Sequence, residues 1–162
     1  MRALVRVTVF AAIVIGFVLP RAAAQGADAW IGTWTLNLAQ SSYDPPNLAP
    51  KNQTTKITAS GDMLTAVTDG ADGDGKKLHT EITYKLDGKD YDYKGAADAN
   101  STRAYTRVDD HHYSYAAKVK GQITTTSRVA VTPDGKTRTI TTTGRDAEGR
   151  VIRNFSVWNR VG

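Results

Sequence analysis

The chain has 162 residues, of which 40% are hydrophobic and 23% charged, a composition that fits one globular domain and excludes a disordered or fibrous protein. It contains no cysteine, which excludes disulfides, thiol catalysis and a lipid-modified cysteine anchor. The formal net charge is +5, but lysines and arginines are scattered among acidic and polar residues, which indicates a solvated surface and argues against a nucleic-acid partner.

The first 24 residues have the pattern of a signal peptide. Arg2 and Arg6 precede an apolar run from Val7 to Leu19, and Ala22-Ala23-Ala24 is the small-residue pattern after which signal peptidases cleave. The run has about 13 residues, whereas a membrane-spanning helix needs roughly 20, so the pattern argues against a permanent membrane anchor. We expect cleavage after Ala24 and an exported, nearly neutral domain over residues 25–162, in the periplasm or outside the cell.

From Trp30 onward, the sequence predicts β-strands and no helix. Short segments rich in threonine, valine, isoleucine and tyrosine alternate polar with apolar residues, and Asp/Gly turns separate them. The proline-bearing segment Ser41 to Asn52 is expected to be a long loop, because proline donates no hydrogen bond to a sheet. The predicted strands cover residues 33–38, 53–59, 63–68, 78–86, 91–94, 102–108, 112–119, 123–131, 137–143 and 151–159.

The spacing of the turns predicts the topology. Gly121, Gly135 and Gly149 recur at even intervals, so long strands are joined in sequence by tight hairpins. This favours an all-β, antiparallel up-and-down meander of eight to ten strands that closes into a barrel, rather than an immunoglobulin-like sandwich. Closure would also remove the exposed edges of such a sheet.

Strand alternation predicts which side chains face the interior. Successive strand residues point to opposite faces, so the apolar positions of each strand define an inner face. We expect the inner faces to carry Trp34, Leu36, Leu38; Leu78, Ile82, Tyr84, Leu86; Tyr113, Tyr115, Ala117, Val119; and Ile123, Thr125, Ser127, Val129, Val131.

These faces contain many hydroxyl groups for a core. A buried hydroxyl without a partner costs roughly 1–3 kcal/mol, so the pattern indicates either a ligand-holding cavity or tyrosines that close the barrel ends with their hydroxyls in water. The cavity hypothesis requires a volume of at least roughly 300 Å³, the lower end for ligand pockets. The lining residues that we predict for it are Tyr84, Tyr91, Tyr93, Tyr113 and Tyr115.

Gly32-Thr33-Trp34 resembles the glycine-x-tryptophan signature of lipocalin and calycin barrels, and Arg160 resembles the basic residue that covers this tryptophan there. The chain is also similar to a family of small secreted bacterial lipocalin-like domains, most of them uncharacterised. The pieces that carry this second likeness are Gly32-Thr33-Trp34-x-Leu36-Asn37, Asp44-Pro45, Pro50-Lys51-x-Gln53, Asp134-Gly135-Lys136-Thr137 and Val157-Trp158-Asn159-Arg160.

The resemblance implies a structural role for Gly32, Trp34 and Arg160, and a barrel that binds a small apolar or amphipathic molecule. The further lipocalin motifs have no equivalent in this sequence, so the resemblance does not name the ligand. The alternative is a structural or protein-interaction module of the cell envelope, which would combine a packed interior with an exposed apolar patch, for instance beside Trp158.

No catalytic or metal-binding pattern competes with these hypotheses. The sequence has no nucleophile elbow, P-loop or His-Glu-x-x-His motif, and Asp90 with Asp92 fits a solvated strand face better than an acid–base pair. We therefore expect no enzyme activity, no cofactor and no metal. His79 and the pair His111–His112 are assigned to solvated positions, and Asp72, Asp74, Gly75 and Glu81 are assigned to a turn and a strand rather than to a calcium loop.

Overall fold

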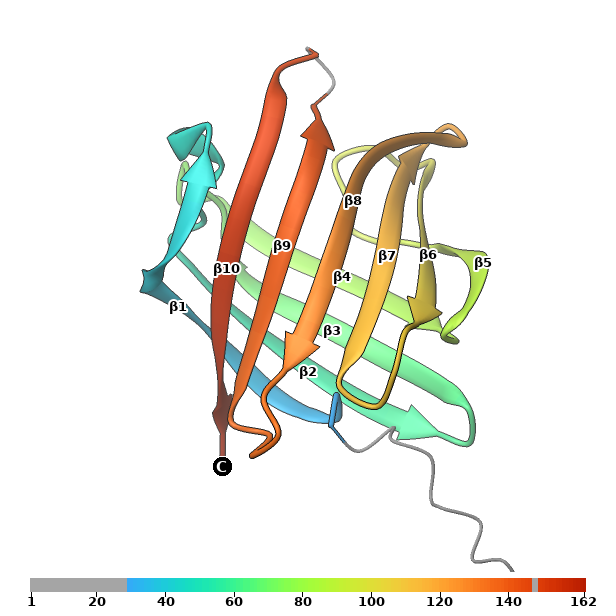
Figure 1. Ribbon diagram of the computed structural model, residues 1–162. Helices are drawn as coiled ribbons and strands as arrows, with labels where there is room; N and C mark the ends of the chain where they lie inside the picture. The colour runs from blue at the N-terminus through green and yellow to red at the C-terminus, as the bar shows by residue number, and fades with distance from the viewer. Residues whose placement is uncertain (1–28, 147–148) are drawn as a thin grey trace, which may run out of the picture.

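The computed structural model describes residues 29–146 and 149–162, so the predicted signal peptide (residues 1–24) lies outside the described residues. The described chain forms one antiparallel sheet of ten strands in the order β4-β3-β2-β1-β10-β9-β8-β7-β6-β5 (Figure 1). The predicted all-β meander is therefore confirmed. The elements are β1 (Gly32–Asp44), η1 (Pro46–Leu48), β2 (Asn52–Ser60), β3 (Met63–Ala71), β4 (Lys77–Tyr84), β5 (Asp87–Asp92), β6 (Ser101–Arg107), β7 (His112–Val119), β8 (Gln122–Val131), β9 (Thr137–Arg145) and β10 (Val151–Val161).

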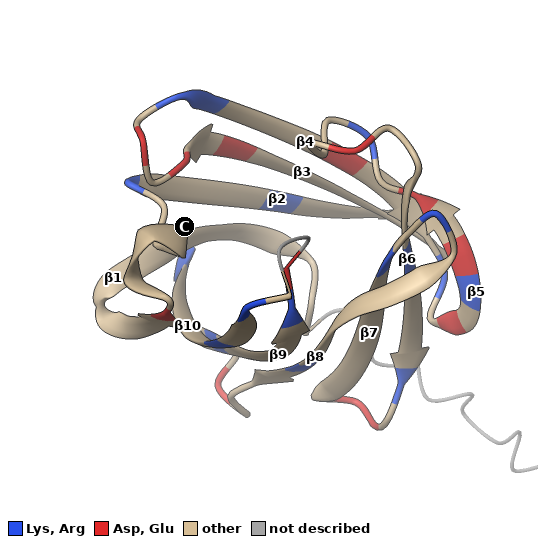
Figure 2. Cartoon of the chain, turned by 90° about the horizontal axis from the view of Figure 1, so that it is seen from above, with Lys and Arg blue, Asp and Glu red and all other residues tan. Residues whose placement is uncertain are grey.

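The sheet curls into a nearly closed barrel whose two edge strands are β4 and β5. Viewed from above, β2 to β4 form one wall and β7 to β10 the opposite wall (Figure 2). In the described chain, one bridge crosses the seam: Glu81 and Lys94 exchange backbone N–H···O bonds of 3.1 and 2.9 Å. The Tyr93 hydroxyl also donates to Thr80 Oγ1 at 3.0 Å. Closure is thus partial, and the rest of the β4 edge pairs with no other strand of the described residues.

The predicted loop over residues 41–52 is wrong in its first part. Strand β1 continues to Asp44, and its register against β10 shifts between Asn37 and Ser42. The Ser41 side chain makes this bulge possible, because its hydroxyl donates to Asn37 O at 2.7 Å and accepts from Val157 N–H at 3.0 Å. A side chain thus replaces the missing ladder bond, and irregular backbone begins only at Pro45.

The predicted strands at residues 78–86 and 91–94 imply a turn at Asp87-Gly88-Lys89, and this prediction is also wrong, because β5 begins at Asp87. The register of β5 against β6 shifts between Asp87 and Asp90, and Gly88 within the shift has φ +78°. A bulge and a hairpin turn both need a positive-φ glycine, so the local sequence does not distinguish them. The connection from β4 to β5 is made instead by Lys85 and Leu86.

The interior follows the predicted alternation except at two positions. Leu38 lies within the β1 bulge and is 38% exposed, and Ile123 lies where the register of β7 against β8 shifts and is 60% exposed. Each irregularity turns an apolar side chain outward, because a shift of one residue reverses the face. The buried hydrophobic cluster consists of Trp30, Trp34, Leu36, Ile57, Leu64, Ile82, Tyr84, Tyr105, Tyr113, Val129, Val131 and Trp158.

Candidate functional site

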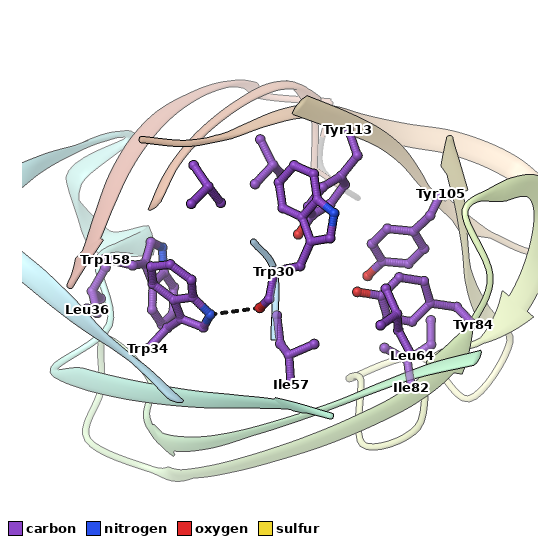
Figure 3. Close-up of a cluster of buried hydrophobic side chains, with 12 residues drawn as sticks. Trp30, Trp34, Leu36, Ile57, Leu64, Ile82, Tyr84, Tyr105, Tyr113 and Trp158 are labelled. Atoms are coloured by element: carbon purple, nitrogen blue, oxygen red, sulfur yellow. Dashed lines mark hydrogen bonds between the residues drawn. The ribbon is translucent and has the colours of Figure 1, made fainter. Parts of the chain in front are cut away.

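An aromatic plug, which we define as Trp30, Trp34 and Arg160, occupies one end of the barrel interior. Both indoles are 0% exposed, and Trp34 Nε1 donates to Trp30 O at 3.0 Å (Figure 3). The Trp30 ring meets Tyr113 edge-on, with 4.5 Å between ring centroids. Two large side chains thus fill this end, and the remaining interior lies on their far side.

Arg160 completes the plug, and its guanidinium is satisfied by backbone. Its centre lies 4.4 Å from the Trp34 ring centroid, and it donates to Ile31 O, to Ala29 O at 2.9 Å and to Gly135 O at 2.5 Å. Gly32 has φ +136°, and a Cβ there would collide with this guanidinium. The residues of the predicted structural signature therefore lie in direct contact.

Beyond the plug, the interior contains a cavity of about 220 Å³. Aromatic rings, aliphatic side chains and hydroxyl groups all line it, and two arginines are its only charged side chains. The lining residues are Tyr43, Gln53, Thr55, Ile57, Ala66, Thr68, Leu78, Thr80, Ile82, Tyr84, Tyr93, Arg103, Tyr105, Tyr113, Tyr115, Arg138, Ile140, Thr142, Asn154, Ser156 and Trp158.

Four of the five predicted tyrosines, Tyr84, Tyr93, Tyr113 and Tyr115, line this cavity. Tyr91 does not line it, because its hydroxyl lies 3.1 Å from both carboxylate oxygens of Asp87, an exposed pair. Four further polar or charged side chains line the cavity that the sequence analysis did not predict there: Tyr43, Arg103, Tyr105 and Arg138. Tyr105 follows the alternation of β6, and Tyr43 faces the cavity because the β1 bulge reverses the alternation before it. The two arginines contradict the expectation that cations face water.

The cavity tyrosines form one packed group. Tyr84 and Tyr105 are stacked with centroids 3.9 Å apart, and Tyr105 lies 5.0 Å from Tyr115 and 6.0 Å from Tyr113. Figure 3 shows the hydroxyls of Tyr84 and Tyr105 pointing in the same direction, toward the middle of the barrel. These rings therefore present polar ends to the cavity from an apolar wall.

Burial keeps these phenols protonated. It raises the pKa of Tyr113 to about 12, against the opposing effect of the nearby Arg138 guanidinium, and it also raises the pKa values of Tyr84 and Tyr105. A protonated phenol is both a donor and an acceptor of hydrogen bonds. At neutral pH the group therefore offers O–H donors to whatever occupies the cavity.

Arg138 and Arg103 lie on the cavity wall formed by β6 to β10. Arg138 is 3% exposed, and its guanidinium lies 4.7 Å from the Trp158 centroid and 5.1 Å from that of Trp34. Arg103 lies 3.6 Å above the Tyr93 ring and 5.1 Å from that of Tyr115. The Nε atom of each arginine is buried without a hydrogen-bond partner.

No carboxylate of the described residues balances these two cations. None of the ion pairs in the described chain involves Arg103 or Arg138, and strands β6 to β10 contain neither aspartate nor glutamate (Figure 2). Burying an ion costs several kcal/mol, whereas a cation–π contact returns about 0.5–2 kcal/mol. Ring contacts alone thus leave Arg138 short of compensation, and burial accordingly lowers its pKa.

Two pairs of hydroxyl groups lie along the barrel interior, one on β2 and β3 and the other on β8 and β9. Thr55 Oγ1 and Thr68 Oγ1 are hydrogen-bonded at 2.8 Å, as are Ser127 Oγ and Thr142 Oγ1. Tyr43 lines both the cavity and a surface groove that includes η1. One aromatic side chain therefore stands between the interior and the outside.

Of the three histidines weighed from the sequence, His79 and His112 lie on the surface, whereas the solvated position expected for His111 is wrong, because this residue is half-buried and its Nδ1 is buried without a hydrogen-bond partner. His79 and His112 contact Asp69 and Asp109 at 2.7 and 2.8 Å, both exposed pairs, and Asp90 accepts from Lys118 Nζ at 2.7 Å. Asp72 Oδ1 accepts from the backbone N–H groups of two residues in its own turn. Among the described residues, no group of three or more His, Cys, Asp or Glu side chains is arranged to hold a metal ion.

Trp158 points into the barrel and does not itself contribute to an exposed apolar patch. Trp158 is 6% exposed, lines the cavity and lies next to Trp34 in the interior (Figure 3). Its indole N–H donates to Ser156 Oγ at 3.0 Å. In the described part of the chain, no helix is long and apolar enough to span a bilayer.

The fold is similar to that of zebrafish ileal bile acid-binding protein, solved in complex with cholic acid. The TM-score is 0.51 at 11% sequence identity, and the match covers 82% of this chain and 99% of that chain. No family model and no curated protein matches the sequence. At this identity the likeness shows the fold alone: the described residues form a nearly closed up-and-down barrel of ten antiparallel strands.

Proposed function

We propose that this protein is an exported carrier that binds a small amphipathic molecule inside its barrel. The observation that carries the proposal is the cavity of about 220 Å³ whose lining combines aromatic faces with hydroxyl and guanidinium groups. A core that serves stability alone excludes such groups, because each must find a partner or reduce stability. The cholic acid bound by a barrel of similar fold supports the same proposal.

The volume restricts the ligand. Ligand pockets for drug-sized molecules span roughly 300–1,000 Å³, and this cavity lies below that range with its tyrosines as they stand. The cavity is therefore smaller than the size that the hypothesis drawn from the sequence required. We propose a smaller molecule, with one apolar portion against the aromatic wall and one polar group among the hydroxyls and guanidiniums.

A substitution that fills the cavity tests this function. Ala66 on β3 lines the cavity between Ile57 and Ile82, whereas its neighbour Val67 points to the outer face. We expect Ala66→Phe to abolish ligand binding and Val67→Phe to retain it. The measurement is native mass spectrometry of each variant purified from the protein's own host, followed by identification of any small molecule that remains bound.

Either of two results would contradict the carrier. One is that no small molecule accompanies the wild-type protein in this experiment, and the other is that Ala66→Phe retains as much of it as Val67→Phe does. The same preparations test export, because the proposed cleavage after Ala24 predicts an intact mass for a chain that begins at Gln25.

A further inference from the structure

We infer that the cavity selects an organic anion, with Arg138 as the group that receives its carboxylate. This inference rests on the proposed function and names the ligand class. The cavity lining contains two guanidiniums and no carboxylate or histidine. A neutral ligand would leave both charges uncompensated, whereas an anion supplies the counter-charge that the described chain lacks.

The two arginines differ in how completely the protein surrounds them. Arg138 is 3% exposed, is flanked by the rings of Trp34 and Trp158, and has a buried Nε without a partner. Arg103 is only partly buried and covers Tyr93 beside the seam between β4 and β5. Arg138 is therefore the deeper cation and gains most from an anion.

The space between the arginines is bounded by shared neighbours. Tyr105 and Tyr115 lie near both guanidiniums, the Tyr115 ring lies 5.1 Å from that of Arg103, and the two rings lie 5.0 Å apart. Tyr113 lies close to Arg138 and 6.0 Å from Tyr105. An anionic group in this space would accept N–H bonds from Arg138 and O–H bonds from a neighbouring phenol, and charge-assisted bonds of this kind are the strong ones.

The size and lining also define the rest of the ligand. Tyr84, Tyr105 and Trp158 offer apolar faces next to the cations, within a cavity smaller than a drug-sized pocket. A short molecule with a carboxylate and a flat or slender apolar body fits both constraints. Aromatic acids of one ring and short-chain fatty acids belong to this class.

Pairs of acids and their amides test the inference, because each pair has the same shape and differs in charge. We would titrate the wild-type protein with benzoate and benzamide, cinnamate and cinnamamide, and hexanoate and hexanamide, using isothermal calorimetry at pH 7. We expect at least one acid to bind ten-fold or more tightly than its amide. Arg138→Met should bring that acid to within about two-fold of its amide, and the exposed β10 variant Arg153→Met should not.

The outcomes separate the two proposals. If an amide binds as tightly as the tightest acid, the barrel still carries small molecules and the anion inference is wrong. If neither acids nor amides bind, and native mass spectrometry finds no ligand either, both proposals are wrong. The comparison on the wild-type protein decides the inference even if Arg138→Met does not fold, and Arg103→Met then serves as the second variant, with a partial loss of the preference expected.

Discussion

Two arginines stack on Trp34 from different parts of the barrel, and they have opposite environments. The guanidinium of Arg160 lies 4.4 Å from the indole centroid and donates to three backbone carbonyls. That of Arg138 lies 5.1 Å from the same centroid, and its Nε has no partner. Arg160 therefore has a structural role, whereas Arg138 is available to a ligand.

The backbone around each arginine explains the difference. The carbonyls of Ala29 and Ile31 come from the segment that enters the barrel before β1, and that of Gly135 from the turn between β8 and β9. In such irregular segments, a backbone carbonyl that is not used by a strand ladder can accept a hydrogen bond from a side chain. Near the start of β9, Arg138 lies between β8 and β10, and the backbone carbonyls around it are used by the sheet, so only side chains or a ligand can satisfy its guanidinium.

The largest effect should come from removing the partnered arginine. Arg160→Met leaves three carbonyls without their donor and removes the contact with Trp34, so we expect the free energy of unfolding to fall by about 3–4 kcal/mol. Equilibrium urea denaturation measures this loss. Arg153→Met, an exposed change on the same strand, should cost less than about 0.5 kcal/mol. Equal losses in the two variants would show that the plug does not hold the barrel.

A smaller effect should appear at alkaline pH, next to Arg138. Burial raises the pKa of Tyr113 to about 12, from 10.0. The folded state thus retains a proton that the unfolded state loses, and stability that is complete below pH 10 is lost as pH rises toward 12. The shift corresponds to about 3 kcal/mol from this group.

Tyr113→Phe tests this linkage, because phenylalanine has no proton to lose. We expect its free energy of unfolding to decline less steeply between pH 10 and 12 than that of the wild-type protein, as measured by urea denaturation at each pH. Parallel declines would mean that Tyr113 already exchanges its proton freely in the folded state.

The sequence predicts the strands of this barrel better than its bulges and its interior side chains. Alternation and turn glycines locate all ten strands, because both signals depend on nearest neighbours. The bulges at residues 38–41 and 87–90 depend on partners far along the chain, such as Val157 against Ser41, and no local pattern identifies them. The partial closure between β4 and β5 also depends on contacts between residues that are not neighbours in the sequence, so no local pattern predicts it.

The cavity arginines were missed for a different reason. Arg138 shares its strand face with Ile140 and Thr142, so alternation alone places it inside. The general preference of arginine for water predicts instead that Arg138 faces solvent, and this prediction is wrong. Position in the strand was the better signal, and the same holds for Arg103, which shares a face with Tyr105 on β6.

The smallest effect on stability should come from Arg138, which pairs with no carboxylate of the described residues, and it sharpens the comparison most. Arg138→Met removes a buried charge that pairs with no carboxylate of the described residues. It also places an apolar side chain of adaptable shape among aromatic rings. After dialysis to remove ligand, we expect its free energy of unfolding to stay within about 1 kcal/mol of the wild-type value or to exceed it. A loss as large as that of Arg160→Met would make Arg138 a structural residue.

Ligand-induced stabilisation gives a second comparison of the same two proteins. With the tightest acid present at 100 times its Kd, the free energy of unfolding of the wild-type protein should rise by about 2.7 kcal/mol. That of the Arg138→Met variant should rise much less, because the anion then lacks its partner.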